Sequence, residues 1–458
     1  MTIKSLSLVL AILTLSACQT VPKQIHLSEN LNNYPKKCTS IDDESCNNNW
    51  WQAFDDPVLN HYMHHVITHN RELSVATLTL QKAIFNHQKI QDNKKIMISS
   101  TALANQRAQK SLATGETSTT GGFEMNVNAS WEIDLWGKLA LQQNISEWET
   151  HASHADRQAV FMSLTATAVR EYFNFLGIVQ KRMDNQQALN HQQKQRQFLQ
   201  NQLKLGLIAP ADTVPIEQTI NNLRQTANNL VQQQHESLTT LSLLSQINKN
   251  DLENQLNTHQ FAFKLPENIQ KLPMNVINNR PDIQAQLSRL TVSLAQKNLI
   301  KKNQYPTLVF TAGASSQHSH LLDLLKVPVL NWGVSLNIPN FNAKDYQHHL
   351  NLAKIDEHIA TLHYQDSVYK ALADVQNKLK NLANLKQNHQ LILTAEQLAQ
   401  QQRSHQQKRY ELGFISAREL EDSKEQARQT QTAVIDSLVN QAQALVNIYQ
   451  AVGGVVDL

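Results

Sequence analysis

The chain has little glycine, proline and cysteine for its length. Its 458 residues include only 11 glycines, 11 prolines and 3 cysteines. So few helix-breaking residues argue against a loop-rich enzyme and favour long uninterrupted helices. The sequence also lacks the GxSxG, P-loop and HExxH patterns, so it offers no recognisable nucleophile, phosphate-binding loop or metalloprotease helix. We therefore predict a protein that is not an enzyme and holds no metal or other free cofactor.

The chain also lacks an excess of one charge and a long apolar run. Its net charge is only +3, with acidic and basic residues interspersed, which argues against a nucleic-acid groove. After the first 20 residues no stretch is apolar enough for a transmembrane helix, which needs roughly 20 apolar residues. If this protein spans a membrane, it must do so by strands.

The N-terminus has the pattern of a secretory signal. Lys4 precedes an apolar run over 6–15, and the small pair Ser16-Ala17 precedes Cys18. This junction resembles a bacterial lipoprotein cleavage site, so we expect a signal peptide over 1–17 and covalent lipid on Cys18. The alternative is an ordinary signal peptide with a chance cysteine. Because Gln follows Cys18, resemblance to that class implies the outer membrane.

The two remaining cysteines are Cys38 and Cys46. In the oxidising periplasm they can close a small disulfide loop. Two separate thiols fit the sequence nearly as well. The spacing is not CxxC, so it does not indicate a zinc or redox site.

Two segments of the chain predict very long helices. Residues 139–205 contain no proline and one glycine, and residues 342–412 contain neither. Each segment indicates one helix on the order of 100 Å long, or two stacked end to end. Gly206 and Gly413 follow these segments and can supply the left-handed stop of a helix. A shorter helix is predicted after each stop.

The segment FEMNVNASWEIDLWGK, residues 123–138, alternates with a period of two. Its odd positions from Phe123 to Leu135 are apolar and its even positions are polar, which predicts a strand with one apolar face. The same alternation recurs over 332–338, with a further strand around 308–312. Alternation alone favours a half-buried strand of a soluble sheet over a membrane strand.

The predicted order helix, strand, strand, long helix, shorter helix occurs twice. We place the first copy at 69–250 and the second at 279–458, with a linker over 251–278 and an N-terminal lipid-anchored segment over 18–68. The expected fold is mixed but mainly α, with an internal duplication and four amphipathic strands.

Three motifs carry a resemblance to a known family. SWEIDLWGK at 130–138, NRPDI at 279–283 and the YELG…ELED run from Tyr410 resemble the TolC-like outer-membrane efflux proteins, specifically their lipoprotein branch. The resemblance implies a homotrimer, in which four strands per chain form one twelve-stranded barrel in outer-membrane lipid. It also implies a hollow α-barrel that extends into the periplasm, a periplasmic membrane-fusion adaptor, and an inner-membrane pump of the RND or ABC type.

The resemblance implies a passive channel for efflux of drugs or other small molecules. Alternatives are a conduit for type I protein secretion, a periplasmic adaptor, or a soluble metalloprotein using the histidines. His61, His64 and His65 can share a helix face, but no cysteine or carboxylate completes a metal site there. The Ser- and His-rich segment 315–320 has no role that we can derive.

The resemblance also suggests functional residues at the ends of the helices. Glu419 and Asp422 match acidic positions that ring the narrow periplasmic mouth in this family; acids at a helix start can equally reflect the helix dipole. Contacts between the two helical hairpins hold that mouth shut in the family. Asp212 and Tyr410 are the candidate pair here, with Arg418 as a possible substitute for an arginine found in some members.

This hypothesis gives a first prediction. Replacing Asp212 with Ala should raise single-channel conductance, because it removes one partner of the link that narrows the mouth. Planar-bilayer recording measures the change. Unchanged conductance would count against a role for Asp212 in closure.

Overall fold

The computed structural model describes residues 49–110, 115, 117–257, 265–266, 278–324, 328–339 and 342–454. The chain divides into two units, 1–49 and 50–458, and only the second is described below. The predicted signal peptide, Cys18, Cys38 and Cys46 lie outside the described residues.

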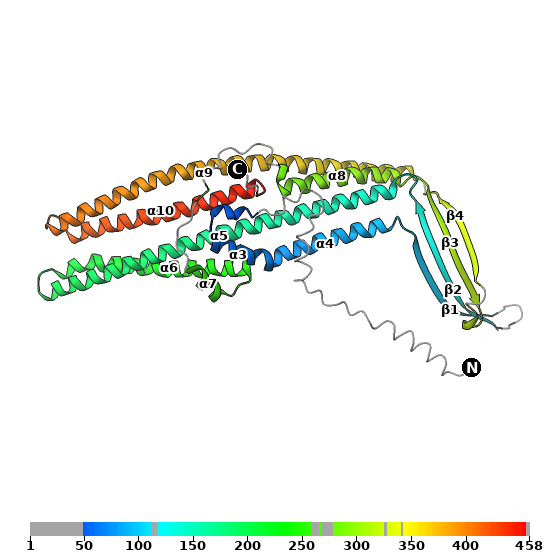
Figure 1. Ribbon diagram of the computed structural model, residues 1–458, viewed down its shortest axis with the longest axis horizontal. Coiled ribbons are helices and arrows are strands. Elements are labelled where there is room, and N and C mark those ends of the chain that lie inside the picture. The colour runs from blue at the N-terminus through cyan, green and yellow to red at the C-terminus, as the bar shows by residue number, and fades with distance from the viewer. Residues whose placement is uncertain are drawn as a thin grey trace, which may run out of the picture. The chain divides into compact units, whose positions relative to one another are not determined.

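The element order in this unit repeats, as the sequence predicts (Figure 1). The first copy comprises α4 (Arg71–Asp92), β1 (Met97–Lys110), β2 (Thr117–Ile133), α5 (Lys138–Lys204) and α6 (Val214–Ser245). The second comprises α8 (Pro281–Lys302), β3 (Thr307–His318), β4 (Val329–Asn337), α9 (Ala343–Glu411) and α10 (Ala417–Ala451). The short elements are η2 (Trp50–Phe54), α3 (Pro57–His69), η3 (Pro210–Thr213), α7 (Lys249–Asn257) and η5 (Leu321–Asp323).

Each of the two long helices is a single uninterrupted element. α5 has 67 residues and α9 has 69, so each is about 100 Å long at 1.5 Å per residue. The first backbone N–H groups of each long helix donate hydrogen bonds to a side chain that precedes the helix. Asp134 accepts hydrogen bonds from Leu139 N and Ala140 N, and Asn342 caps α9.

The four strands form one antiparallel sheet in the order β1-β2-β3-β4. The register sets apolar residues side by side on one face. The cross-strand rows are Ile133–Leu308–Leu336, Trp131–Phe310–Val334 and Ala129–Ala312–Trp332. The alternation that the sequence shows therefore marks one continuous apolar face.

The strand bounds differ from the sequence interpretation at two points. β2 begins at Thr117 and ends at Ile133, so Leu135 and Trp136 lie in the turn that leads into α5. The Ser- and His-rich segment 315–320, which the sequence suggests is a loop, is strand as far as His318, where β3 ends; Ser315 still pairs with Val329 and Asn126.

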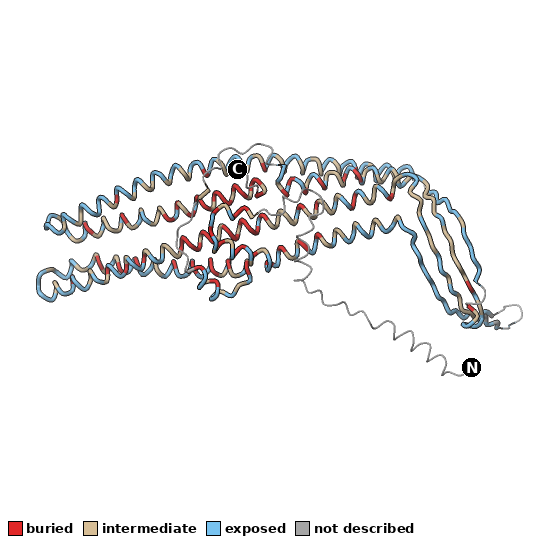
Figure 2. The backbone as a smooth tube through the Cα atoms, in the orientation of Figure 1, coloured by how far each residue is buried: buried red, intermediate tan, exposed pale blue. Residues whose placement is uncertain are grey.

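The hydrophobic core lies midway along the helices, where α3 and η2 pack on α5, α6 and α10. Figure 2 shows the buried residues gathered there, while the sheet and the hairpin tips are mostly exposed or intermediate. Trp50 stacks on Tyr449 at a centroid distance of 5.3 Å, and Phe54 meets Phe173 at 4.9 Å. Asp56 caps α3 and accepts a hydrogen bond from the buried Tyr172 hydroxyl.

Among the described residues, the edge strands β1 and β4 each pair with a neighbouring strand on one side only. The exposed side chains on β4 include Leu330, Trp332 and Leu336, at 77%, 80% and 58% exposure. The free backbone N–H and C=O groups at such edges can pair with another strand, and a large exposed apolar face is typical of a surface that contacts protein or lipid. Among the described residues, none of the helices combines the length and hydropathy needed to cross a bilayer.

The crossing of α5 and α10 yields a second prediction. A Cβ atom at Gly177 would lie 2.6 Å from a side-chain methyl of Val439, which is 8% exposed. Gly177→Leu should therefore overpack this crossing and lower the free energy of unfolding by about 3 kcal/mol. Thermal unfolding in detergent, followed by circular dichroism, measures the loss.

Gln187→Leu on the exposed side of α5 is the matched control, and it should unfold at the wild-type temperature. Val439→Ala should restore part of the stability that Gly177→Leu removes. Equal melting temperatures for the Gly177 and Gln187 variants would show that the crossing is not tightly packed.

Candidate functional site

The two hairpin tips end their long helices in the same way. Gly206 and Gly413 have φ angles of +72° and +77°, which confirms the predicted left-handed stops. Gly206 N bonds to Leu203 O and Gly413 N to Tyr410 O, both at 3.0 Å. No heavy atom lies within 4 Å of a Cβ built on either glycine, so the backbone conformation alone requires glycine.

Asp212 and Glu419 occupy equivalent positions after these turns. Asp212 Oδ2 accepts a hydrogen bond from Ala209 N at 2.8 Å, and Glu419 Oε2 accepts one from Ser416 N at 3.3 Å. Each carboxylate therefore closes the first turn of its own helix, and Ser416 with Glu419 forms a capping box. Asp422, one turn further along α10, is exposed.

Both tips present large apolar side chains to solvent. Leu205 and Leu207 flank Gly206 and are 74% and 67% exposed. Leu412 and Phe414 flank Gly413 and are 70% and 71% exposed. Matching apolar pairs at the ends of both hairpins make the tips a suitable surface for another protein.

A small cavity of about 50 Å³ brings the three gating candidates together. Asp212, Tyr410 and Arg418 all line it, and so does Glu421 on α10. The sequence therefore selects residues that meet across the two hairpins. Glu419 and Asp422 are not among the lining residues.

Sequence reasoning missed a buried polar link beside this cavity. Gln192 of α5 is 5% exposed and donates a hydrogen bond to the Glu421 carboxylate. Lys424 contacts the other oxygen of Glu421 at 2.9 Å and lies 3.4 Å from His191 Nε2. Gln192 is one of many glutamines in α5, so no sequence signal distinguishes it.

The electrostatics of this link favour a neutral histidine. Burial, and then the neighbouring Lys424, lower the pKa of His191, although Glu421 acts in the opposite direction. A neutral imidazole can accept a hydrogen bond from the Lys424 ammonium. The four side chains Gln192, Glu421, Lys424 and His191 therefore connect the first hairpin to the second.

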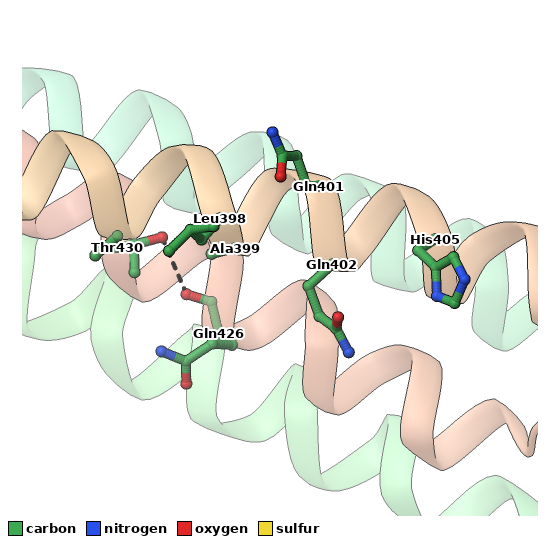
Figure 3. A pocket seen from close by; sticks show the side chains of 8 residues that line it. Leu398, Ala399, Gln401, Gln402, His405, Gln426 and Thr430 are labelled. Carbon is green, nitrogen blue, oxygen red and sulfur yellow. Dashed lines mark hydrogen bonds between the residues drawn. The ribbon is translucent and has the colours of Figure 1, made fainter.

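An open groove of about 590 Å³ runs between α9 and α10 near their tips. Figure 3 shows its lining, in which Leu398, Gln402 and His405 come from α9 and Gln426 and Thr430 from α10. The Thr430 hydroxyl donates to Gln426 O at 3.2 Å. Most of the lining side chains are small, amide or apolar; His405 adds an imidazole and Thr430 a hydroxyl, and no carboxylate is among them.

The histidines of α3 form a surface row. His65 lies between His61 and His69, at ring-centroid distances of 5.0 and 5.5 Å, and His64 is 6.2 Å away. Within the part of the chain that the structure describes, no three His, Cys, Asp or Glu residues converge to hold a metal ion. Burial, followed by repulsion from the other three rings, lowers the pKa of His65.

Comparison with known proteins identifies the family. The model of the family "Outer membrane efflux protein" matches residues 67–245 and 272–454. The chain belongs to this family. Each matched range covers one copy of the repeated element order, so both halves contribute to the assignment.

Individual relatives are similar over nearly their whole length. Toxin and drug export protein A of Aggregatibacter actinomycetemcomitans is 22% identical, covering 99% of this chain and 98% of the relative. The probable outer membrane lipoprotein SilC of Salmonella typhimurium is 24% identical, covering 95% of this chain and 92% of the relative. The outer membrane channel CmeC of Campylobacter jejuni has a TM-score of 0.79 at 21% identity, covering 89% and 88% of the two chains.

Membership of this family establishes the cellular location of the protein and its general function. The protein is an outer-membrane efflux protein and not an enzyme, as the sequence predicts. The fold is mixed and mainly α, with long helices, an internal duplication and four strands, which is also as predicted. The cavity, the polar link and the exposed apolar tips together make up its candidate functional site.

The polar link generates a third prediction. Glu421→Ala should leave the Gln192 amide buried without its partner, at a cost of about 1–3 kcal/mol. The tip of α10 should then open more often, so the backbone amides of residues 417–424 should exchange hydrogen faster. Hydrogen–deuterium exchange with mass spectrometry measures the rates.

Glu425→Ala is the matched control, because Glu425 pairs with Arg428 on its own helix. That variant should leave exchange at residues 417–424 close to wild type. Equal exchange in the two variants would mean that the α5–α10 link does not hold the tip.

Proposed function

We propose that three copies of this chain close their sheets into one twelve-stranded barrel in the outer membrane. The observation that carries the proposal is a sheet with a continuous apolar face and two unpaired edges. In lipid, every backbone polar group needs a partner, and only a closed barrel gives one to both edges. Strands of 9 to 17 residues satisfy the roughly 9–11 residues needed to span a bilayer.

The assembled channel is a passive conduit of a tripartite export system. The long helices of three copies form the periplasmic extension, and the exposed apolar tips near 204–214 and 411–422 dock a membrane-fusion adaptor. An inner-membrane pump of the RND or ABC type supplies the energy and selects the substrate, which we assign to small molecules such as drugs. Matching apolar pairs at both tips support this docking surface.

Lipid on Cys18 anchors the mature N-terminus to the outer membrane. The sequence before Cys18 supports this assignment, as does the description of one relative as a probable outer membrane lipoprotein. Stable membrane attachment generally needs two membrane-binding signals, and the lipid on Cys18 and the inserted barrel would supply them. A disulfide between Cys38 and Cys46 remains a proposal for the segment that follows.

The periplasmic mouth carries the selectivity and the closure of the channel. Asp422 supplies an acidic ring in the trimer, and Glu419, whose carboxylate also caps α10, adds to it. Such a ring attracts cations and repels anions. Asp212, Tyr410 and Arg418 meet at the cavity beside the Gln192–Glu421 link, so this is where the two hairpins hold each other.

A second candidate is a conduit for secreted proteins in a type I system. The relative named toxin and drug export protein A favours it, because that name includes a toxin besides drugs as exported cargo. The two candidates share the same channel and differ in the pump partner.

The fourth prediction tests the conduit directly. The purified, detergent-extracted protein should give cation-selective conductance steps in planar bilayers. Asp422→Asn should lower the cation-over-anion permeability ratio by about fivefold, which corresponds to about 1 kcal/mol of lost attraction. Reversal potentials in a salt gradient measure this ratio.

Glu419→Gln is the comparison variant, because Gln at this position preserves the capping box. It should change the ratio less than Asp422→Asn does. A stable trimer that inserts but passes no current would overturn the channel assignment, and an unchanged ratio in Asp422→Asn would overturn only the acidic ring.

A further inference from the structure

A cluster of lysines lies where the helices meet the strands. Figure 1 shows that α4, α5, α8 and α9 each have one end next to the sheet, and at least one lysine lies at or just beyond each of these ends. We call this set the lysine girdle, and its members are Lys94, Lys95, Lys138, Lys301, Lys302 and Lys344.

The girdle recurs in both halves of the chain. The pair Lys94-Lys95 stands just before β1, and the pair Lys301-Lys302 stands just before β3. Lys138 is the first residue of α5, and Lys344 is the second residue of α9. The two copies have diverged elsewhere, so the recurrence sets these positions apart from scattered surface lysines.

Helix electrostatics explain only part of the pattern. Lys301 and Lys302 lie in the last turn of α8, where the negative end of the helix dipole favours them, whereas Lys94 and Lys95 follow the end of α4. Lys138 and Lys344 lie at helix N-termini, where the dipole disfavours a positive charge. Glu132 offsets this effect for Lys138, and an external anion would offset it for the exposed Lys344.

Contacts with aromatic residues indicate where the girdle lies relative to the proposed membrane interface. The indole N–H of Trp131 donates to Lys94 O at 3.1 Å, and the Lys302 ammonium donates to Trp136 O at 2.6 Å. Trp136 also stacks on Tyr305, with ring centroids 5.2 Å apart. Trp and Tyr are enriched at membrane interfaces, and lysine stems can reach from there to the headgroups.

The charge balance at this level is positive. Segments 92–97, 131–138, 301–307 and 337–345 contain six lysines and four acidic residues, which gives +2 per chain. The acids are largely occupied: Asp92 pairs with Lys95 at 2.7 Å, Glu132 pairs with Lys138 at 2.6 Å, and Asp134 caps α5. Lys301 and Lys344 are exposed.

We infer that the lysine girdle binds the phosphate groups of anionic phospholipids, in the leaflet where the helices leave the membrane. The inference rests on the proposed membrane insertion of the strands. Each lysine near a charged bilayer surface adds to the attraction, and a trimer presents three copies of the girdle around one circumference. The expected ligands are phosphatidylglycerol and cardiolipin, with zwitterionic phosphatidylethanolamine bound more weakly.

The test is native mass spectrometry of the detergent-solubilised trimer with an equimolar mixture of phosphatidylglycerol and phosphatidylethanolamine. Wild type should retain more phosphatidylglycerol, and raising the salt concentration should reduce the preference. The triple variant Lys95→Gln, Lys301→Gln, Lys344→Gln should lower the ratio of anionic to zwitterionic adducts by about tenfold.

The control is Lys370→Gln, Lys380→Gln, Lys408→Gln, which removes three exposed lysines of α9 away from the sheet. It should keep the wild-type ratio. Soluble glycerol phosphate at millimolar concentration should not displace the lipid; displacement would mean a free-phosphate site and would overturn the inference. Equal ratios in the two triple variants, or no preference in wild type, would also overturn it.

Planar-bilayer recording separates this inference from the proposed function. A trimer that conducts ions without a preference for anionic lipid overturns the girdle alone. A protein that neither inserts nor conducts overturns the proposed function itself.

Discussion

Unpaired backbone at the edges of the sheet is the constraint on which the rest of this structure depends. β1 and β4 each have a partner on one side only, and the apolar face between them is open. A soluble monomer would expose both to water at the risk of aggregation. The proposed closure by three chains answers both problems at once, and it places the helices that follow the strands around a common axis.

The helices solve a different problem, because their largest hydrophobic core occupies only a short zone along their length. Aromatic residues from η2, α3, α5 and α10 meet midway, and the ends are held by narrower contacts. Near the tips, the first hairpin has a smaller apolar cluster of its own, and polar side chains join it to the second hairpin. The Gln192–Glu421–Lys424 link is of this kind, and polar links of modest strength suit the place where we propose that the channel opens and closes.

Much of this arrangement can be predicted from the sequence, and the reasons are local. Alternation with period two gives the strands, the scarcity of Gly and Pro gives the long helices, and Gly206 and Gly413 mark where they stop. The family motifs point to Asp212, Tyr410 and Arg418, which line one cavity. The capping role of Glu419 follows from Ser416 three residues earlier, although from the sequence we consider only the pore ring and the helix dipole for this residue. Gln192 could not be predicted, because its importance comes from burial against another helix far away in the sequence.

The duplicated turn has a consequence for symmetry. Each chain has two hairpin tips, which share the glycine conformation, the carboxylate cap and the exposed apolar side chains beside the glycine. In the proposed trimer these become six near-equivalent positions around the axis, arranged with approximate sixfold symmetry. A partner that recognises only the shared features meets six docking places, whereas one that recognises the differences, such as Leu207 against Phe414 or Pro210 against Ala417, meets three.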